Sequence, residues 1–251
     1  MNDWDMEKAR DLVLSPDQRV RSLWRESGLA STAFHQVWWG LVRLYLGVAH
    51  RLRVIGREHL PTEPPFILAG NHSSHLDALV LAAPLSWRLR DQIFPIAAGD
   101  VFFVTWAKSV FAALLLNALP LWRKNCGTHA LEELRKRLVE EPCSYILFPE
   151  GKRSRDGKML PFKPGLGMLV AQTRVPVVPC YITGAFEALR PETNWPRLGR
   201  RITVRVGPAL CFEKTDNDRA GWKSVATALR EAVEKLAEQG EARIHHENTK
   251  A

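Results

Sequence analysis

The sequence predicts an α/β fold, in which a mixed, largely parallel sheet is covered by helices and apolar interfacial helices lie at the N-terminus and within the chain. The order of the segments along the chain predicts it. Short apolar runs rich in β-branched residues, several of them bounded by Gly or Pro, alternate with helical patterns along the 251 residues. Such alternation is typical of a sheet whose faces are covered by helices.

Six segments have the composition of strands, and we predict them at residues 52–55, 65–70, 93–97, 143–148, 175–182 and 202–207. A helix is expected over residues 128–141, because Leu131, Leu134 and Leu138 share one face. A second helix is expected at the C-terminal end, where apolar residues recur at helical spacing: Trp222, Val225, Leu229, Val233 and Leu236.

Two apolar segments, residues 34–49 and 101–122, do not have the pattern of ordinary amphipathic helices. Each carries tryptophan and is flanked or interrupted by Arg or Lys, and each falls short of the roughly 20 apolar residues that a spanning helix needs. We interpret both as helices at a membrane interface, the alternative being two buried core helices. The mixed-charge N-terminus lacks the apolar region of a secretory signal.

The charge of the chain is concentrated in its middle. The formal net charge is +8, but residues 34–215 hold 24 basic and 14 acidic residues, a surplus of +10. Such a surplus favours acidic partners, among them phosphate-bearing metabolites, anionic lipid and nucleic acid. The two ends are expected to be solvated appendages.

The cysteines give no sign of a metal or redox site. Cys126, Cys143, Cys180 and Cys211 are widely spaced and form no CxxC pair. We expect buried free thiols rather than disulfides.

The first chemical motif is NHSSHLD, residues 71–77, directly after a predicted strand. In an open α/β sheet this places His72 at the carboxyl edge, where ligands bind. A helix starting near Ser74 would bring Asp77 back to the imidazole, as a general base and its orienting carboxylate require. Two other interpretations remain open: a helix cap with surface histidines, and a metal site formed by His72, His75 and Asp77.

The second motif is FPEGKRSR, residues 148–155, also after a predicted strand. It puts Glu150 and three cations, among them Arg153, on one loop that contains Gly151. Guanidinium groups and backbone amides on such a loop suit a phosphate, although the cations could also form a solvated turn. The spacing of Gly and Lys matches neither a Walker loop nor a dinucleotide fingerprint, so ATP and NAD have no support.

Two weaker signals complete the set. Arg123 follows the second apolar segment, and residues 175–179 read VPVVP. By itself the arginine is typical of a helix end, and the proline-punctuated run is typical of a buried or edge strand.

Taken in order, NHxSxxD, an arginine after an apolar segment, FPEGxRS and VPVVP resemble the glycerophospholipid acyltransferase family, in particular the PlsC-like 1-acylglycerol-3-phosphate (lysophosphatidic acid) acyltransferases. The resemblance covers residues 54–208. It implies that His72 is the general base and Asp77 its partner in the HxxxxD dyad. It also implies that Arg123, Glu150, Gly151 and Arg153 bind the acceptor and its phosphate.

The resemblance has two departures, at the second block and at Lys152. The second block usually reads GxxFIxR, and here only the arginine and an apolar neighbour remain. The third block usually has Thr where this chain has Lys152. Both departures fall where the acceptor head group should bind.

We expect an organisation in four parts: a polar N-terminal arm (1–33), an apolar membrane-interface helix (34–50), an acyltransferase catalytic domain (51–215), and a C-terminal helix with a polar tail (216–251). The expected reaction moves an acyl group from a thioester donor, acyl-CoA or acyl carrier protein, to a lysophospholipid hydroxyl. The thioester is already activated, so no metal or other cofactor is expected. Backbone amides at Ser73 and Ser74 are candidate donors to the oxyanion.

The expected place of work is the cytoplasmic face of a membrane, with peripheral or monotopic attachment. Within the enzyme class, the acceptor could instead be glycerol 3-phosphate, another lysophospholipid or an amino-lipid. A catalytically silent membrane-binding or lipid-carrying protein, a metallohydrolase and a nucleic-acid binder are further alternatives. Retention of both His72 and Asp77 argues against a silent protein, and no motif supports nucleic-acid binding.

Overall fold

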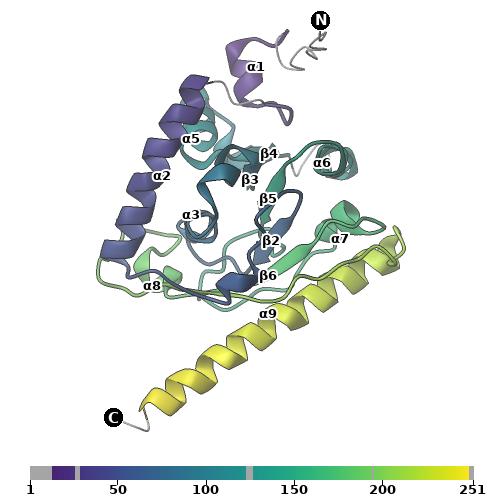
Figure 1. Cartoon of the computed structure of the whole chain (residues 1–251). Coiled ribbons are helices and arrows are strands. Elements are labelled where there is room, and N and C mark those ends of the chain that lie inside the picture. The colour runs from purple at the N-terminus through teal and green to yellow at the C-terminus, as the bar shows by residue number, and fades with distance from the viewer. Residues whose placement is uncertain (1–12, 26–28, 123–126, 194, 249–251) are drawn as a thin grey trace, which may run out of the picture.

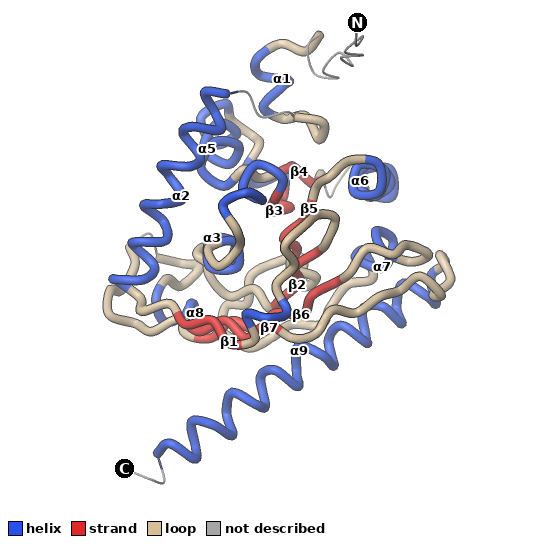
Figure 2. The backbone as a smooth tube through the Cα atoms, viewed as in Figure 1, coloured by secondary structure: helices blue, strands red, loops and turns tan. Residues whose placement is uncertain are grey.

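The computed structural model describes residues 13–25, 29–122, 127–193 and 195–248. Within these ranges the chain forms a seven-stranded sheet in the order β1-β7-β6-β2-β5-β3-β4, with helices packed against it (Figures 1 and 2). Neighbouring strands run parallel except β6 and β7, which are antiparallel. The predicted fold class is confirmed.

Six strands lie within two residues of their predicted ends: β1 (Arg53–Ile55), β2 (Ile67–Gly70), β3 (Ile93–Ala98), β5 (Ser144–Leu147), β6 (Val177–Thr183) and β7 (Thr203–Val206). β2 lies at the centre of the sheet with β5 beside it, and both are buried at every position. A strand covered on both faces has no solvated side, which explains the almost continuous apolar runs in the sequence.

The two faces of the sheet carry two hydrophobic cores. Phe66 and Leu68 belong to one core, together with residues of α2 (Leu29–Ala49) and α3 (Asp77–Ala82). Their neighbours Ile67 and Ala69 belong to the other, with α6 (Gly127–Glu140), α7 (Gly165–Val170) and α9 (Arg219–Asn248). Successive residues of a strand point to opposite faces, so β2 serves both cores.

The predicted C-terminal helix is present and is part of the core. α9 extends from Arg219 to Asn248, and its residues Val225, Leu229 and Val233 are fully buried. The expectation that the C-terminal end is a solvated appendage is therefore wrong for this stretch, because the apolar side chains that recur at helical spacing along it pack into the core on one face of the sheet. The far end of α9 extends away from the sheet (Figure 1).

The first apolar segment forms one helix and the second does not. α2 spans 21 residues, and five large apolar side chains form an exposed stripe along it: Phe34, Val37, Leu41, Leu44 and Val48. In the part of the chain that the structure describes, no helix is both long enough and apolar enough to cross a membrane.

The second apolar segment divides into α4 (Gly99–Phe102), α5 (Trp106–Leu116) and β4 (Leu119–Leu121). A single helix over residues 101–122 is therefore wrong. Asn117 takes a left-handed conformation, with φ of 51°, and this ends α5. Pro120 then sits in the edge strand β4, where a residue without an N–H group is tolerated.

The remaining elements are short: α1 (Pro16–Val20), the 3-10 turns η1 (Arg57–His59) and η2 (Trp87–Gln92), and α8 (Ala185–Ala188). Cys143 and Cys180 are buried free thiols, as predicted. Cys211 is also free but exposed, so the expectation of burial is wrong there, and Cys126 lies outside the described residues.

Candidate active site

Two loops meet at the carboxyl edge of the sheet. β2 ends at Gly70 and is followed by Asn71 and His72, and the adjacent parallel strand β5 ends at Leu147 and is followed by the loop that carries Glu150 and Arg153. Because parallel strands present their carboxyl ends on the same side, the NHSSHLD and FPEGKRSR segments come together there.

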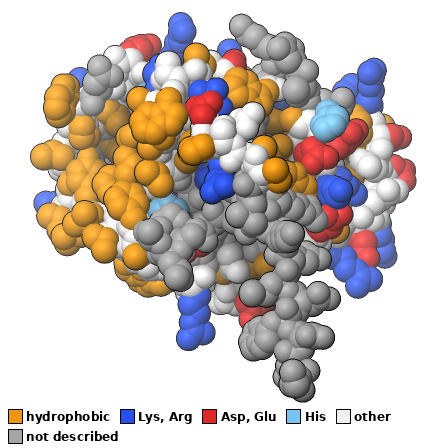
Figure 3. Space-filling view, turned by 90° about the horizontal axis from the view of Figure 1, so that it is seen from above, with side chains coloured by type: hydrophobic (Ala, Val, Ile, Leu, Met, Phe, Trp, Pro, Cys, Tyr) orange, Lys and Arg blue, Asp and Glu red, His pale blue; other side chains and the backbone are white. Residues whose placement is uncertain are grey.

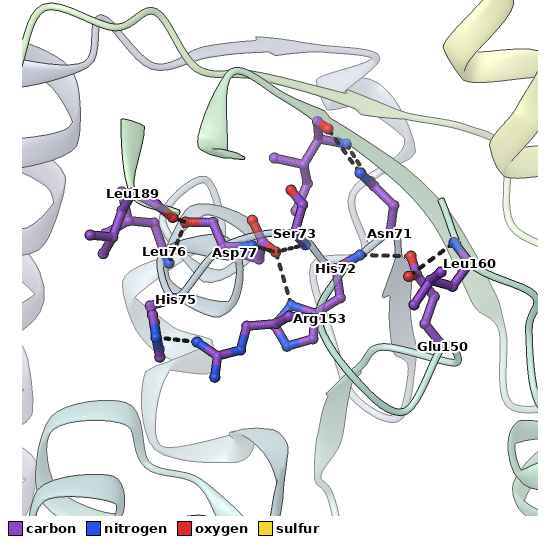
Figure 4. A network of polar contacts seen from close by, with 12 residues as sticks. Asn71, His72, Ser73, His75, Leu76, Asp77, Glu150, Arg153, Leu160 and Leu189 are labelled. Carbon is purple, nitrogen blue, oxygen red and sulfur yellow. Dashed lines mark hydrogen bonds and ion pairs between the residues drawn. The ribbon is translucent and has the colours of Figure 1, made fainter. Parts of the chain in front are cut away.

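His72 and Asp77 form a hydrogen-bonded pair. The Nδ1 atom of His72 lies 2.9 Å from Oδ2 of Asp77, which is fully buried at the first position of α3 (Figure 4). An ionised carboxylate only accepts, so it fixes the proton of a neutral imidazole on Nδ1 and leaves the lone pair on Nε2. The His72 side chain is 22% exposed, which allows a substrate to reach it.

Asp77 also organises the backbone of the loop. Its Oδ2 atom accepts hydrogen bonds from the amides of Ser73 at 2.7 Å and Ser74 at 2.8 Å. These two amides are thus occupied, and the prediction that they donate to an oxyanion is wrong. The helix begins at Asp77, three residues after Ser74, and the Ser74 hydroxyl accepts from the Leu76 amide and donates to the Leu189 carbonyl.

The second loop holds His72 from the other side. The imidazole stacks on the ring of Phe148, with centroids 4.1 Å apart and planes 13° from parallel. The backbone carbonyl of His72 accepts from the Ser154 amide at 2.8 Å. These contacts, together with Asp77, fix the plane and the position of the imidazole.

Glu150 is turned toward the backbone. It is 2% exposed, and its two carboxylate oxygens accept hydrogen bonds from the amides of His72 at 2.9 Å and Leu160 at 3.1 Å (Figure 4). Burial raises the pKa of Glu150 to about 7, although the two backbone hydrogen bonds act in the opposite direction. The carboxylate therefore links the two loops.

Gly151 and Arg153 follow on the same loop. Gly151 has φ of 71°, and a Cβ at this position would lie 2.9 Å from Nζ of Lys163, so the turn favours glycine. Arg153 is half-buried, and its guanidinium donates a hydrogen bond to Nε2 of His75. Burial lowers the pKa of Arg153, and the charge of Asp77 partly offsets this, so the guanidinium lies near the dyad.

Arg123, the remaining predicted site residue, lies outside the described residues. β4 ends two residues before it and runs parallel to β3, so the chain leaves β4 at the same edge of the sheet that carries the two loops. Sequence reasoning placed Arg123 by its order among the motifs alone.

Three structural contributions of the loops were not predicted. Asn71 anchors the first loop, because its side chain exchanges two hydrogen bonds with the backbone of Ile182, at 3.0 and 2.8 Å. Phe148 supports the imidazole, and Ser154 bonds to the carbonyl of His72. All three belong to the quoted motifs, so their place in the blocks was a signal, but their partners were not readable from the sequence.

Among the described residues, no three His, Cys, Asp or Glu side chains are placed to hold a metal ion. In particular, the Nε2 atom of His75 accepts from Arg153 rather than facing His72 and Asp77.

A match to a family model spans both loops. A family model described as "Acyltransferase" matches residues 51–183, which include His72, Asp77, Glu150 and Arg153. The chain belongs to this acyltransferase family. The resemblance drawn from the four motifs is confirmed at the level of the family.

Curated relatives of this acyltransferase chain include two enzymes of distant origin. The 1-acyl-sn-glycerol-3-phosphate acyltransferase alpha of Mus musculus is 33% identical over 166 residues, 65% of this chain and 56% of that protein. The 1-acyl-sn-glycerol-3-phosphate acyltransferase of Limnanthes douglasii is 31% identical over 173 residues, 68% of this chain and 58% of that protein. The chain thus spans a little over half the length of these relatives.

A solved structure has the same fold as this acyltransferase chain. It is the crystal structure of the 1-acyl-sn-glycerophosphate (LPA) acyltransferase PlsC from Thermotoga maritima, which aligns with a TM-score of 0.63 over 83% of this chain and 79% of that one. The sequence identity is 21%, so the likeness concerns the fold.

Proposed function

We propose that the protein transfers a fatty acyl group from a thioester donor, acyl-CoA or acyl carrier protein, to the hydroxyl of a lysophospholipid. The proposed acceptor is 1-acylglycerol 3-phosphate, and the product is then phosphatidic acid. The observation that carries the proposal is the pair formed by His72 and the buried carboxylate of Asp77, at 2.9 Å on the carboxyl edge of the sheet. The names of the curated relatives support the choice of acceptor.

His72 acts as the general base in this proposal. Its Nε2 atom takes the proton of the acceptor hydroxyl while the oxygen attacks the thioester carbonyl. A tetrahedral intermediate forms, the carbon–sulfur bond breaks, and the proton passes from Nε2 to the leaving thiolate. The buried carboxylate of Asp77 stabilises the imidazolium between these two proton transfers.

Positioning of the acceptor is assigned to the loop after β5 and to Arg123. Arg153 and Arg123 bind the phosphate of the acceptor, because guanidinium groups pair with phosphate oxygens in a two-pronged geometry. The left-handed turn at Gly151 sets the path of this loop. Glu150 lies on the same loop and is assigned to acceptor binding with it. Holding the hydroxyl near Nε2 lowers the barrier by reducing the entropy that the reaction must lose. The thioester supplies the activation, so the proposal includes no metal or other cofactor.

We propose that the protein acts at a membrane surface, attached peripherally or monotopically to the cytoplasmic face. The stripe on α2 includes Val37 at 67% and Leu44 at 63% exposure, and exposed apolar residues also occur on and around α4 and α5, among them Val104, Trp106 and Phe111. Apolar side chains gather on the same side of the molecule in Figure 3. A patch of this kind marks an interaction site, and acceptor and product are lipids.

The test is an acyl-transfer assay on the purified full chain. Labelled acyl-CoA and acyl carrier protein thioesters are offered with a panel of acceptors: 1-acylglycerol 3-phosphate, glycerol 3-phosphate, other lysophospholipids and an amino-lipid. We expect phosphatidic acid from the first acceptor and none from His72→Ala, which should still bind the acceptor. If only a different acceptor is acylated, the proposed acceptor is wrong. Appreciable turnover by His72→Ala would refute the role of His72.

A further inference from the structure

His75 lies outside the proposed dyad but within the same motif. Its Nε2 atom accepts a hydrogen bond from the guanidinium of Arg153, which comes from the neighbouring loop, 78 positions further along the chain (Figure 4). Among the described residues, His75 is the one hydrogen-bond partner of the Arg153 side chain. The contact joins the first loop to the loop that carries the proposed phosphate-binding arginine.

Only a neutral imidazole can accept this hydrogen bond, because a protonated ring has donors on both nitrogens. Burial lowers the pKa of His75, and the positive charge of Arg153 lowers it further, with a smaller effect of His72 in the same direction. A hydrogen bond with the backbone of Pro191 and the charge of Asp77 act in the opposite direction. In the neutral ring, Nε2 is the nitrogen that accepts from Arg153.

We propose that His75 is a positioning residue, which holds the guanidinium of Arg153 in the orientation that receives the phosphate of the acceptor. This inference rests on the proposed function, since it concerns the same acceptor site. In this proposal His75 acts through Arg153 and does not itself contact the reacting atoms or the phosphate.

The chemistry of the guanidinium explains why fixing its orientation favours phosphate binding. Arginine offers five N–H donors in one plane, and His75 uses one of them, so the others stay available for phosphate oxygens. A free arginine side chain loses rotamer entropy when it binds, and a side chain that is already held loses less. A neutral acceptor holds the guanidinium without competing for it as a carboxylate would.

The experiment measures the KM for 1-oleoylglycerol 3-phosphate and kcat for the full chain and four variants: His75→Leu, His75→Gln, Arg153→Ala and the double variant His75→Leu/Arg153→Ala. His75→Leu removes the acceptor, and we expect the KM for the acceptor to rise about tenfold with kcat little changed. His75→Gln keeps an acceptor oxygen and an N–H donor without a titrating group, and it should restore most of the affinity. His129→Leu, an exposed histidine on α6, serves as the matched control.

The double variant shows whether His75 acts through Arg153. If His75 acts through Arg153, His75→Leu should add no further increase in KM once Arg153 is alanine. An equal increase in both backgrounds would overturn the proposal, as would a fall in kcat alone or a failure of His75→Gln to restore the affinity. If the unaltered chain does not acylate 1-oleoylglycerol 3-phosphate, the proposed function has failed instead, and the two failures are distinguishable.

Discussion

Replacing Asp77 by asparagine tests the proposed dyad most directly. The variant keeps the size of the side chain, and its amide oxygen can occupy the place of Oδ2, where it still accepts from the amides of Ser73 and Ser74. The NH₂ group then takes the place of Oδ1, which is buried and has no hydrogen-bond partner among the described residues. We expect a folded protein with a free energy of unfolding lowered by about 1–3 kcal/mol.

The effect on catalysis comes from the lost negative charge. At the observed 2.9 Å and an effective dielectric constant of about 20, a carboxylate and an imidazolium attract each other by about 6 kcal/mol. The amide dipole retains part of this attraction, so we expect the transition state to lose about 3–5 kcal/mol. That loss corresponds to a fall in kcat of about 10²- to 10⁴-fold.

The assay compares kcat, acceptor KM and thermal unfolding of Asp77→Asn with those of the unaltered chain. Asp91→Asn is the matched control, because Asp91 makes a contact of the same kind with Nδ1 of the buried His35, at 2.7 Å, on η2 and α2. The control should lose stability and keep its kcat. If Asp77→Asn retains kcat within about fivefold while folded, or if Asp91→Asn loses as much activity, the charge of Asp77 does not have the proposed role in catalysis.

The other predictions concern the acceptor, the buried carboxylate, the membrane patch and the packing of α9. Arg153→Ala should raise the KM for the phosphate-bearing acceptor about tenfold or more, and an effect confined to the KM of the acyl donor would contradict its phosphate role. Glu150 has a raised pKa, about 7 against 4.5, so its contribution to stability is fully present below about pH 4.5 and declines as the pH rises to 7, by about 3 kcal/mol. Glu150→Gln should flatten the stability profile over this window in chemical denaturation, and an unchanged slope would show that the carboxyl does not titrate there. Leu41→Glu/Leu44→Glu on the exposed stripe of α2 should reduce sedimentation with anionic phospholipid vesicles about tenfold or more, whereas Val139→Glu, equally exposed on α6, should not. Equal vesicle binding by both variants would place the membrane contact elsewhere. Gly167→Ala would set a Cβ 2.4 Å from Cα of Trp222 and should lower the melting temperature, whereas Gly47→Ala, with nothing within 4 Å, should keep or raise it.

Much of the site was predictable because its parts follow the strands directly. His72 and Asp77 are five positions apart, and the turn between a strand and a helix brings them together. The parallel arrangement of β2 and β5 then brings Arg153 and Glu150 to the same edge of the sheet. The strands were recognisable as short apolar runs, and their alternation with helical patterns indicated that they run parallel.

The errors concern groups with several available partners. The amides of Ser73 and Ser74 were free candidates for an oxyanion in the sequence, but the carboxylate of Asp77 takes both of them. A metal site that includes His75 was one of the open alternatives, and His75 bonds to Arg153 instead. The segment 101–122 was apolar enough for one helix, and a left-handed residue at Asn117 allows it to end in an edge strand.

The local sequence pattern thus determined the α/β class, six strands, the helices α6 and α9, and which residues make up the motifs. Periodicity and short spacings carry this information, because they reflect contacts between residues near in the chain. Tertiary packing decided which oxygen of Asp77 binds which donors, that Glu150 faces two backbone amides, and that His75 meets Arg153. Partners 78 positions apart are joined only when two strands pair and bury the groups between them, and the need to satisfy every buried polar group then selects among the possible hydrogen bonds.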